Sequence, residues 1–216
     1  MNQKVTSAIQ RLNTILPLRE NQQALNKPLR ELHRAILCSY VEKGRSLNRT
    51  EMANFVDNID EAIATFKQYD LLVFNDNDEP VGTYPFTMEP RVHRVNVNGH
   101  TVHCMCALDA LAVSPMFHLP TQIHTRCHVS SRPISLQQNE MDITSDDQPL
   151  YFGINWNAAS TKSCCANSLC TEMIFLAGDD TAKNWLLESS DKREIFTLQE
   201  AVAFATGFFV PLMHDH

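Results

Sequence analysis

A hairpin signal near the middle of the chain does most to restrict its fold. Apolar and polar residues alternate over residues 91–97, as in a strand with one buried face, and residues 101–103 begin a return strand. Asn98-Gly99 lies between them, and this dipeptide favours the tight turn that joins antiparallel strands. Further short strands are expected at residues 123–129, 134–136, 151–156 and 171–176. Because the strands do not alternate with helices in β-α-β units, the sequence predicts an α+β fold with antiparallel sheets.

The first part of the chain is mainly helical in character. Helices are expected over residues 6–16, 28–40, 51–56 and 59–69. Two short strand-like segments, residues 71–74 and 81–84, follow them and suggest a β-hairpin. Helices followed by a hairpin resemble a winged helix. We therefore expect a winged-helix-like region over residues 1–85, packed on a mixed core over residues 86–216.

The expected core also contains helices. One is predicted from Cys106 to Val113, with Pro115 helping to end it because proline cannot donate the next backbone hydrogen bond. Two closing helices are predicted at residues 181–187 and 198–208. The core therefore mixes short antiparallel sheets with helices.

Charge argues against nucleic-acid binding. The net charge is −7. The segment that would act as the recognition helix carries one lysine against four acidic residues, namely Lys67, Asp57, Asp60, Glu61 and Asp70. The tip of the expected hairpin is acidic too, with Asp76, Asp78 and Glu79. Since phosphates repel such faces, we expect no nucleic-acid partner and a packing role for the region.

The cysteines indicate free thiols rather than disulfides. The first four residues lead into a polar stretch, and the apolar run over residues 203–212 is too short and interrupted to span a bilayer. We therefore expect a cytoplasmic protein with no membrane partner, where an odd cysteine count argues against a disulfide framework. The seven cysteines are Cys38, Cys104, Cys106, Cys127, Cys164, Cys165 and Cys170.

The segment Cys106-Ala107-Leu108-Asp109 places a thiol and a carboxylate three residues apart in an apolar stretch. On a helix this spacing brings both side chains to one face. An acid among apolar residues requires a partner or a chemical role, because burial of an unpaired charge is costly. With a distant second thiol such as Cys170, these residues could form a binding site for a soft metal beside a proton donor.

Three spaced blocks resemble the organomercurial lyases (alkylmercury lyases). The first is Cys106-Ala107-Leu108-Asp109, and the second runs from Cys127 to Pro133-Ile134-Ser135-Leu136. The third is Ser168-Leu169-Cys170, which leads through a strand to a helix with Ala182 and Trp185. A helical, winged-helix-like region before a mixed catalytic core is also similar to this family. The resemblance covers most of the chain.

The resemblance implies a reaction and roles for three residues. Cys106, Cys170 and Asp109 would form the mercury site, with both cysteines binding as thiolates and the second thiolate weakening the carbon–mercury bond. Asp109 would also relay a proton to the leaving carbon. The products would be a hydrocarbon and Hg(II). No cofactor is implied. The implied partners are organomercury substrates, with small thiols or a mercuric reductase as acceptors of Hg(II).

The chain departs from the family at several positions beside these thiols. Met105 and Leu169 stand where aromatic residues are frequent, and Thr171-Glu172 follow Cys170 in place of a second cysteine and a histidine. The additional thiols are Cys104, Cys164 and Cys165. Cys164 and Cys165 are candidates for extra mercury contacts, and either is an alternative to Cys170 as second ligand. The uninterrupted spacing from Cys170 to Trp185 favours Cys170.

Two other functions fit some of these residues. A thiol-rich sensor or carrier of a soft metal would use the same cysteines, but it needs no proton donor beside them. A cysteine hydrolase would need a placed histidine and an oxyanion site. The histidines of the core lack the paired spacing of a zinc site, although His103 and His128 lie near thiols in the sequence. Cys127 is expected to be a buried structural thiol, and Cys38 a core residue.

Overall fold

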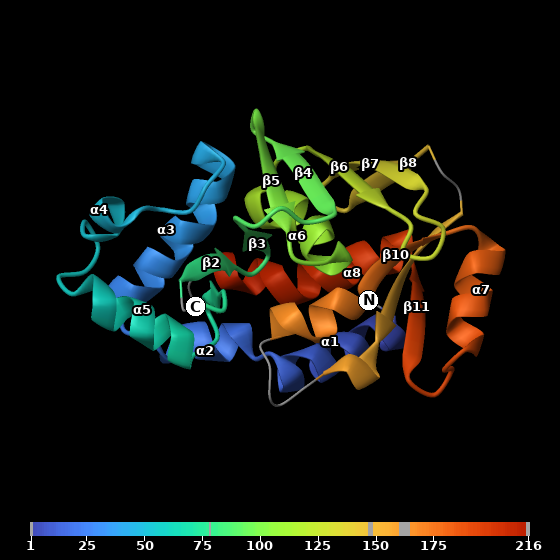
Figure 1. Ribbon diagram of the computed structural model, residues 1–216, viewed down its shortest axis with the longest axis horizontal. Helices are drawn as coiled ribbons and strands as arrows, with labels where there is room; N and C mark the ends of the chain where they lie inside the picture. Colours follow the sequence, from blue (N-terminus) through green and yellow to red (C-terminus); the bar gives the residue numbers. More distant parts are fainter. Residues whose placement is uncertain (1, 78, 147–148, 160–164, 215–216) are drawn as a thin grey trace.

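The computed structural model describes residues 2–77, 79–146, 149–159 and 165–214 (Figure 1). Its helices and antiparallel strands confirm the α+β class. The N-terminal part holds α1 (Gln3–Ile15), α2 (Leu18–Ala24), α3 (Lys27–Lys43), α4 (Arg49–Met52) and α5 (Ile59–Gln68). The sequence predicted all of these except α2, which is short and has no side-chain cap at its start.

Asparagine starts most of these helices. The side chains of Asn2, Asn26, Asn48 and Asn58 each accept a hydrogen bond from the backbone N–H three residues later. An asparagine at this position satisfies one of the N–H groups that the first helical turn leaves without a partner. Local sequence chemistry therefore fixes where α1, α3, α4 and α5 begin.

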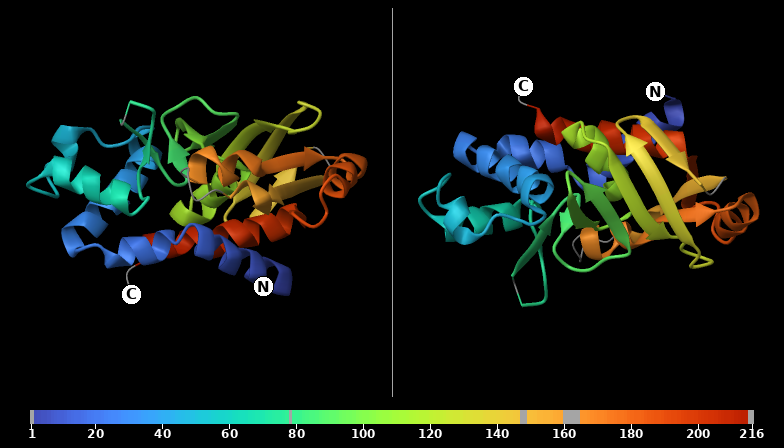
Figure 2. Two further views of the ribbon diagram at one scale, coloured as in Figure 1. Left: turned by 60° about the horizontal axis from the view of Figure 1, so that its bottom comes forward. Right: turned by 90° about the horizontal axis from the view of Figure 1, so that it is seen from above.

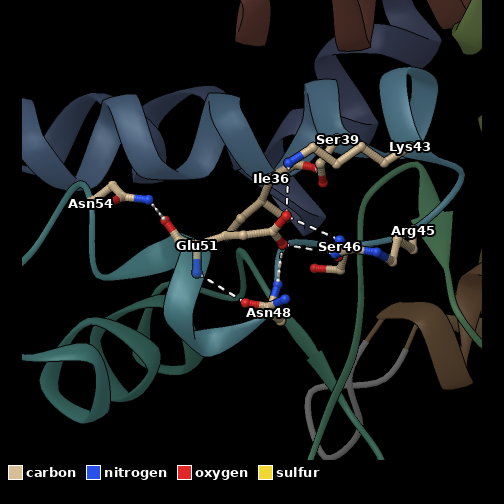
Figure 3. Close-up of polar contacts among 8 residues, drawn as sticks. All are labelled: Ile36, Ser39, Lys43, Arg45, Ser46, Asn48, Glu51 and Asn54. Atoms are coloured by element: carbon tan, nitrogen blue, oxygen red, sulfur yellow. Dashed lines mark hydrogen bonds and ion pairs between the residues drawn. The ribbon is translucent and has the colours of Figure 1, made fainter.

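The connection between α3 and α4 is organised around Glu51 (Figure 3). The Glu51 carboxylate accepts a hydrogen bond from the Asn48 N–H at 2.8 Å, and the Asn48 side chain accepts one from the Glu51 N–H at 2.9 Å. Arg45 and Lys43 donate to the same carboxylate at 2.7 and 2.8 Å. These donors, Arg45 above all, hold the pKa of Glu51 far below its usual range. Gly44 ends α3 with a φ of +70°, a conformation that glycine adopts without strain.

A large antiparallel sheet carries most of the strands. It comprises β1 (Val73–Phe74), β2 (Pro80–Thr83), β3 (Phe86–Thr87), β4 (His93–Val97), β5 (His100–Cys104), β6 (Thr121–Arg126), β7 (Pro133–Asn139) and β8 (Asp142–Ser145). Their spatial order is β1-β2-β3-β5-β4-β6-β7-β8. Strands β4 and β5 pair with Val97 opposite His100, which confirms the turn at Asn98-Gly99. Because β2 pairs with β3, and β3 with β5, the sheet continues across residue 85. The division into two regions stays a prediction.

A second sheet has the order β10-β9-β11, with β9 (Leu150–Asn155), β10 (Met173–Ala177) and β11 (Arg193–Thr197). Short 3₁₀ turns η1 (Trp156–Ala158), η2 (Cys165–Asn167) and η3 (Leu169–Glu172) precede β10, and α7 (Asp179–Leu187) follows it. Gly153 lies where a Cβ atom would come within 2.9 Å of the Trp185 ring, so this helix packs directly on the sheet backbone. The sequence did not predict β3, β8 or β11.

Helix α6 (Ala107–Phe117) is the central helix of the molecule, and residues 107–116 are all buried. The prediction that it ends near Pro115 is wrong, because the helix continues to Phe117. Pro115 has no N–H to offer the carbonyl of Leu111. The Gln138 side chain on β7 supplies that hydrogen bond instead, at 2.9 Å. The hydrogen bond from Gln138 thus satisfies the carbonyl that Pro115 leaves without a donor.

The last helix, α8 (Leu198–Phe209), brings the C-terminal part of the chain into contact with the N-terminal helix α1. It packs against α6 on one side and α1 on the other, and Figure 2 shows α1 and α8 lying alongside each other. The 3₁₀ turn η4 (Val210–Met213) follows. One continuous hydrophobic core includes residues of α1, α3, α6, both sheets and α8. Among the described residues, no helix is both long and apolar enough to cross a membrane.

Candidate active site

Cys106 lies at the junction of β5 and α6, where it is the N-cap of the helix and not part of its first turn. Its backbone is extended, with φ −147° and ψ 179°, and its Sγ accepts a hydrogen bond from the Asp109 N–H at 3.4 Å. The thiol therefore occupies the position that serine or aspartate usually fills at a helix start. This capping contact orients the sulfur toward the first turn of α6, where Asp109 lies.

Asp109 is a buried acid in that first turn, with 1% of its surface exposed. Its Oδ2 atom has no hydrogen-bond partner among the residues that the structure describes. Burial raises the pKa of Asp109 to about 7, although hydrogen bonds with Cys106 act to lower it. Asp109 can therefore both accept and donate a proton near neutral pH.

Cys170, from η3, joins these two residues although it lies 64 positions after Cys106 in the sequence. One ligand atom each of Cys106, Asp109 and Cys170 lie within 4.8 Å of one another. We call these three residues the thiol–carboxylate cluster. Within the described chain, no histidine takes part in a metal-ligand grouping of this kind. The structure thus brings together the three residues that the sequence singled out.

Both thiols of the cluster have raised pKa values, which keep them protonated. Burial raises the pKa of Cys106 to about 12, while a hydrogen bond with Cys170 acts in the opposite direction. The pKa of Cys170 lies well above its ordinary value, chiefly because of hydrogen bonds with Cys106 and Cys165 and then because of burial. A soft metal ion must therefore displace these protons when it binds, and Asp109 is placed to receive one.

A cavity of about 250 Å³ leads to the cluster. Its lining includes Cys170, Met173, Cys127, His93, His128 and Arg126. His128 and Arg126 are exposed, so the cavity opens to the surface, whereas Cys170 and Met173 are buried at its inner side. The cavity is therefore a candidate path from the surface to Cys170.

His93 forms part of the buried wall of this cavity. Its Nδ1 lies 2.8 Å from the Thr125 Oγ1, and burial lowers the pKa of His93 to about 3. The ring is therefore neutral near pH 7. His128 lies at the exposed end of the same cavity. That these histidines share a cavity could not be predicted from the sequence, because only the sheet brings β4 and the end of β6 together.

Met173 is a contact of the site that sequence reasoning missed. The Cys106 thiol donates to its Sδ across 3.6 Å. Met173 begins β10 directly after η3, so the turn that carries Cys170 also leads to this thioether. A methionine three residues after a ligand cysteine is too common a pattern to have indicated the contact.

The remaining cysteines differ in their surroundings. Cys127 is buried beside the site, just beyond the end of β6, and accepts a hydrogen bond from the Ala177 N–H at 3.4 Å. Burial acts to raise the pKa of Cys127, but hydrogen bonds with Ser130, Ala177 and Val129 bring it below its ordinary value. Cys104 is buried on β5. The prediction that Cys38 is a core residue is wrong, since Cys38 is half-buried on α3.

Cys165 lies next to Cys170, with 3.8 Å between the two Sγ atoms. Cys164 lies outside the described residues. Cys165, one of the two alternatives to Cys170 as second ligand, therefore lies beside Cys170 but is not a member of the thiol–carboxylate cluster.

Comparison with known proteins identifies the family. Residues 86–210, more than half of the chain, match the sequence profile of the family described as MerB, alkylmercury lyase. The chain belongs to the alkylmercury lyase family. This finding confirms both the resemblance drawn from the three blocks and the expectation of an enzyme of this family.

Individual relatives are distant in sequence. An alkylmercury lyase from Bacillus cereus is 24% identical over 178 residues, which cover 82% of this chain and 81% of that protein. An alkylmercury lyase from Streptomyces lividans is 26% identical over 102 residues. That match spans 47% of this chain and 47% of the relative, about half the length of each.

The fold is also similar to that of a solved structure, the mercury-bound form of MerB2. The TM-score is 0.72 at 17% sequence identity, and the match covers 91% of this chain and 98% of the other. At this identity the similarity shows the fold alone.

Proposed function

We propose that this chain cleaves the carbon–mercury bond of organomercury compounds by protonolysis, giving a hydrocarbon and Hg(II). Cys106 and Cys170 bind mercury as thiolates, and Asp109 relays the proton. The observation that carries this proposal is the thiol–carboxylate cluster itself: two buried sulfurs and a buried carboxylate within 4.8 Å of one another. Family membership supports the same reaction class.

The proton can be followed from atom to atom. An organomercurial arrives as a complex with a small thiol, and Cys106 displaces that thiol, its own proton leaving on the displaced sulfur. Cys170 then binds the same mercury, and its proton passes to the Asp109 carboxylate. The protonated Asp109 donates this proton to the carbon as the carbon–mercury bond breaks. The hydrocarbon departs, Hg(II) stays on the two thiolates, and Asp109 is again a carboxylate.

The position of Asp109 beside the two thiols favours the proton-transfer steps. A second thiolate adds electron density to mercury and makes the attached carbon more basic, which is the condition for protonation. Asp109 lies where water does not compete as a proton source, since it is 1% exposed. Its pKa of about 7 allows it to exchange protons with both a thiol and a carbon at neutral pH.

A thiol-based sensor or carrier of soft metals is the rival function. It would need the two thiols of the cluster but no acid between them. The unpartnered Oδ2 of Asp109 favours cleavage, because a buried carboxylate oxygen without a hydrogen bond costs stability and is retained where it has a chemical role.

The proposal requires no cofactor, because mercury is part of the substrate and of the product. Small thiols or a mercuric reductase are the proposed acceptors of Hg(II), and a cytoplasmic setting would supply such thiols. Nucleic acid has no part in the proposal, since the segment resembling a recognition helix is acidic.

The test is hydrocarbon release. Reduced protein is incubated with phenylmercury and excess small thiol, and benzene is measured by gas chromatography. The wild type should release benzene, Cys106→Ser, Cys170→Ser and Asp109→Ala should not, and Cys38→Ser should match the wild type because Cys38 lies on α3. Stoichiometric mercury binding by the wild type without any benzene would overturn the proposal and leave the carrier function.

A further inference from the structure

Cys170 has two other buried thiols near it. Cys106 lies within the 4.8 Å of the thiol–carboxylate cluster, and the Cys165 Sγ is 3.8 Å from the Cys170 Sγ. The exposed fractions are 1% for Cys106, 4% for Cys170 and 6% for Cys165. A sulfur–sulfur separation of 3.8 Å is short enough for both atoms to bind one soft ion, and thiolates are the ligands that such an ion prefers.

The backbone around Cys165 is held in place. Cys165 begins η2, which packs against η3, the turn that carries Cys170. The Ala166 N–H donates to the buried Tyr84 hydroxyl at 3.0 Å, and the Ser168 N–H donates to the Cys165 carbonyl at 3.1 Å. These contacts hold Cys165 in a defined position beside Cys170.

Cys165 differs from Cys170 in its relation to the cavity. Among the described residues, the cavity wall includes Cys170 and does not include Cys165. The Cys165 sulfur therefore belongs to a residue outside the cavity wall, 3.8 Å from the Cys170 sulfur. An ion that exchanges Cys106 for Cys165 stays bound to Cys170 throughout.

We propose that Cys165 is a third sulfur ligand for the Hg(II) product. It binds the ion together with Cys170 when the bond between mercury and Cys106 breaks. The proposal rests on the cleavage proposed above. In the exchange, the bond between mercury and the Cys106 sulfur breaks and a bond to the Cys165 sulfur forms. The Cys165 thiol proton passes to the Cys106 sulfur, and no atom is oxidised or reduced. Cys106 thereby regains its proton beside Asp109, and an external thiol removes Hg(II) from the Cys170–Cys165 pair.

The test uses Hg(II) itself, so its outcome does not depend on cleavage. One equivalent of mercuric chloride is added to reduced Cys106→Ser protein, in which Cys170 and Cys165 remain. The concentration of dithiothreitol that removes half of the bound mercury is then measured. In Cys106→Ser/Cys165→Ser this concentration should fall by about a hundredfold, because the loss of one of two linked ligands removes the advantage of chelation. Cys106→Ser/Cys38→Ser is the matched control and should retain mercury as Cys106→Ser does.

Equal retention by Cys106→Ser and Cys106→Ser/Cys165→Ser would overturn the proposal. Loss of retention on replacing Cys164 instead of Cys165 would overturn it as well. Circular dichroism of each variant, with Cys165→Ala as a second substitution, separates misfolding from loss of a ligand. Benzene release by the wild type is recorded in parallel. Its absence would reject the cleavage proposal while the retention data still decide whether Cys165 binds Hg(II).

Discussion

At the scale of single residues, the site depends on the difference between its sulfurs and its carboxylate. In the proposed mechanism the sulfurs of Cys106 and Cys170 bind mercury, whereas Asp109 transfers a proton. Burial raises the pKa of Asp109 to about 7, so the acid and its conjugate base are both available near neutrality. Replacement by asparagine keeps the size of this side chain and removes its proton.

Asp109→Asn should therefore separate mercury binding from chemistry. We expect the variant to bind phenylmercury on its thiols but to release benzene slower by roughly 10²–10⁴-fold, the usual contribution of a placed general acid. Native mass spectrometry should show the intact phenylmercury adduct accumulating on the variant. Benzene release at the wild-type rate would contradict the role of Asp109 and direct attention to water or a thiol as proton donor.

At the scale of elements, α6 is the part that carries Cys106 and Asp109, and its length depends on a contact from outside the helix. Pro115 leaves the Leu111 carbonyl without its helical donor, and the Gln138 side chain donates to it at 2.9 Å. Both groups are buried. The stability of the helix thus depends on β7.

Gln138→Ala should destabilise the protein by about 1–3 kcal/mol, because it leaves a buried carbonyl unsatisfied. Urea unfolding measures this change in the free energy of unfolding. Gln137→Ala is the matched control, since Gln137 is the exposed neighbour on the same strand, and it should stay close to the wild type. If the two variants unfold at the same urea concentration, the hydrogen bond to Leu111 contributes little to stability.

Elements encoded by local chemistry were predictable from the sequence. Asn98-Gly99 specifies the turn between β4 and β5, and the three-residue spacing of Cys106 and Asp109 places both at the start of α6. The end of α6 was not predictable. Pro115 predicts an early end because it cannot donate to the Leu111 carbonyl, but Gln138 on β7 donates to that carbonyl instead. The contact of Cys106 with Met173, and that of Cys170 with Cys106, depend on how η3 and β10 fold back onto α6.

At the scale of the whole molecule, a buried hydrogen-bonded chain links the N-terminal helices to the large sheet. His33 on α3 contacts the Gln22 Nε2 at 2.8 Å and the Thr83 Oγ1 at 3.1 Å, and Thr83 donates to the Leu71 carbonyl at 2.8 Å. These partners fit a neutral imidazole, with one nitrogen accepting and the other donating. Burial lowers the pKa of His33 to about 4 from 6.5.

This shift predicts how stability depends on pH. The unfolded chain binds a proton on His33 below about pH 6.5, whereas the folded protein does so only near pH 4, so the contribution is complete above pH 6.5 and is lost as the pH falls. Between pH 7 and pH 4 the loss should be about 3 kcal/mol. His33→Gln should flatten this part of the stability profile in urea unfolding. A slope in His33→Gln equal to that of the wild type would contradict the assignment.

The central claim is that a proton from the buried cluster breaks the carbon–mercury bond, and its direct test is the isotope content of the hydrocarbon. Phenylmercury is turned over in D₂O by protein whose exchangeable protons have been replaced, and the benzene is analysed by mass spectrometry. We expect benzene carrying one deuterium from the wild type, and benzene release slower by roughly 10²–10⁴-fold from Asp109→Asn. Undeuterated benzene, or mercury bound at Cys106 and Cys170 with no benzene formed, would contradict the claim.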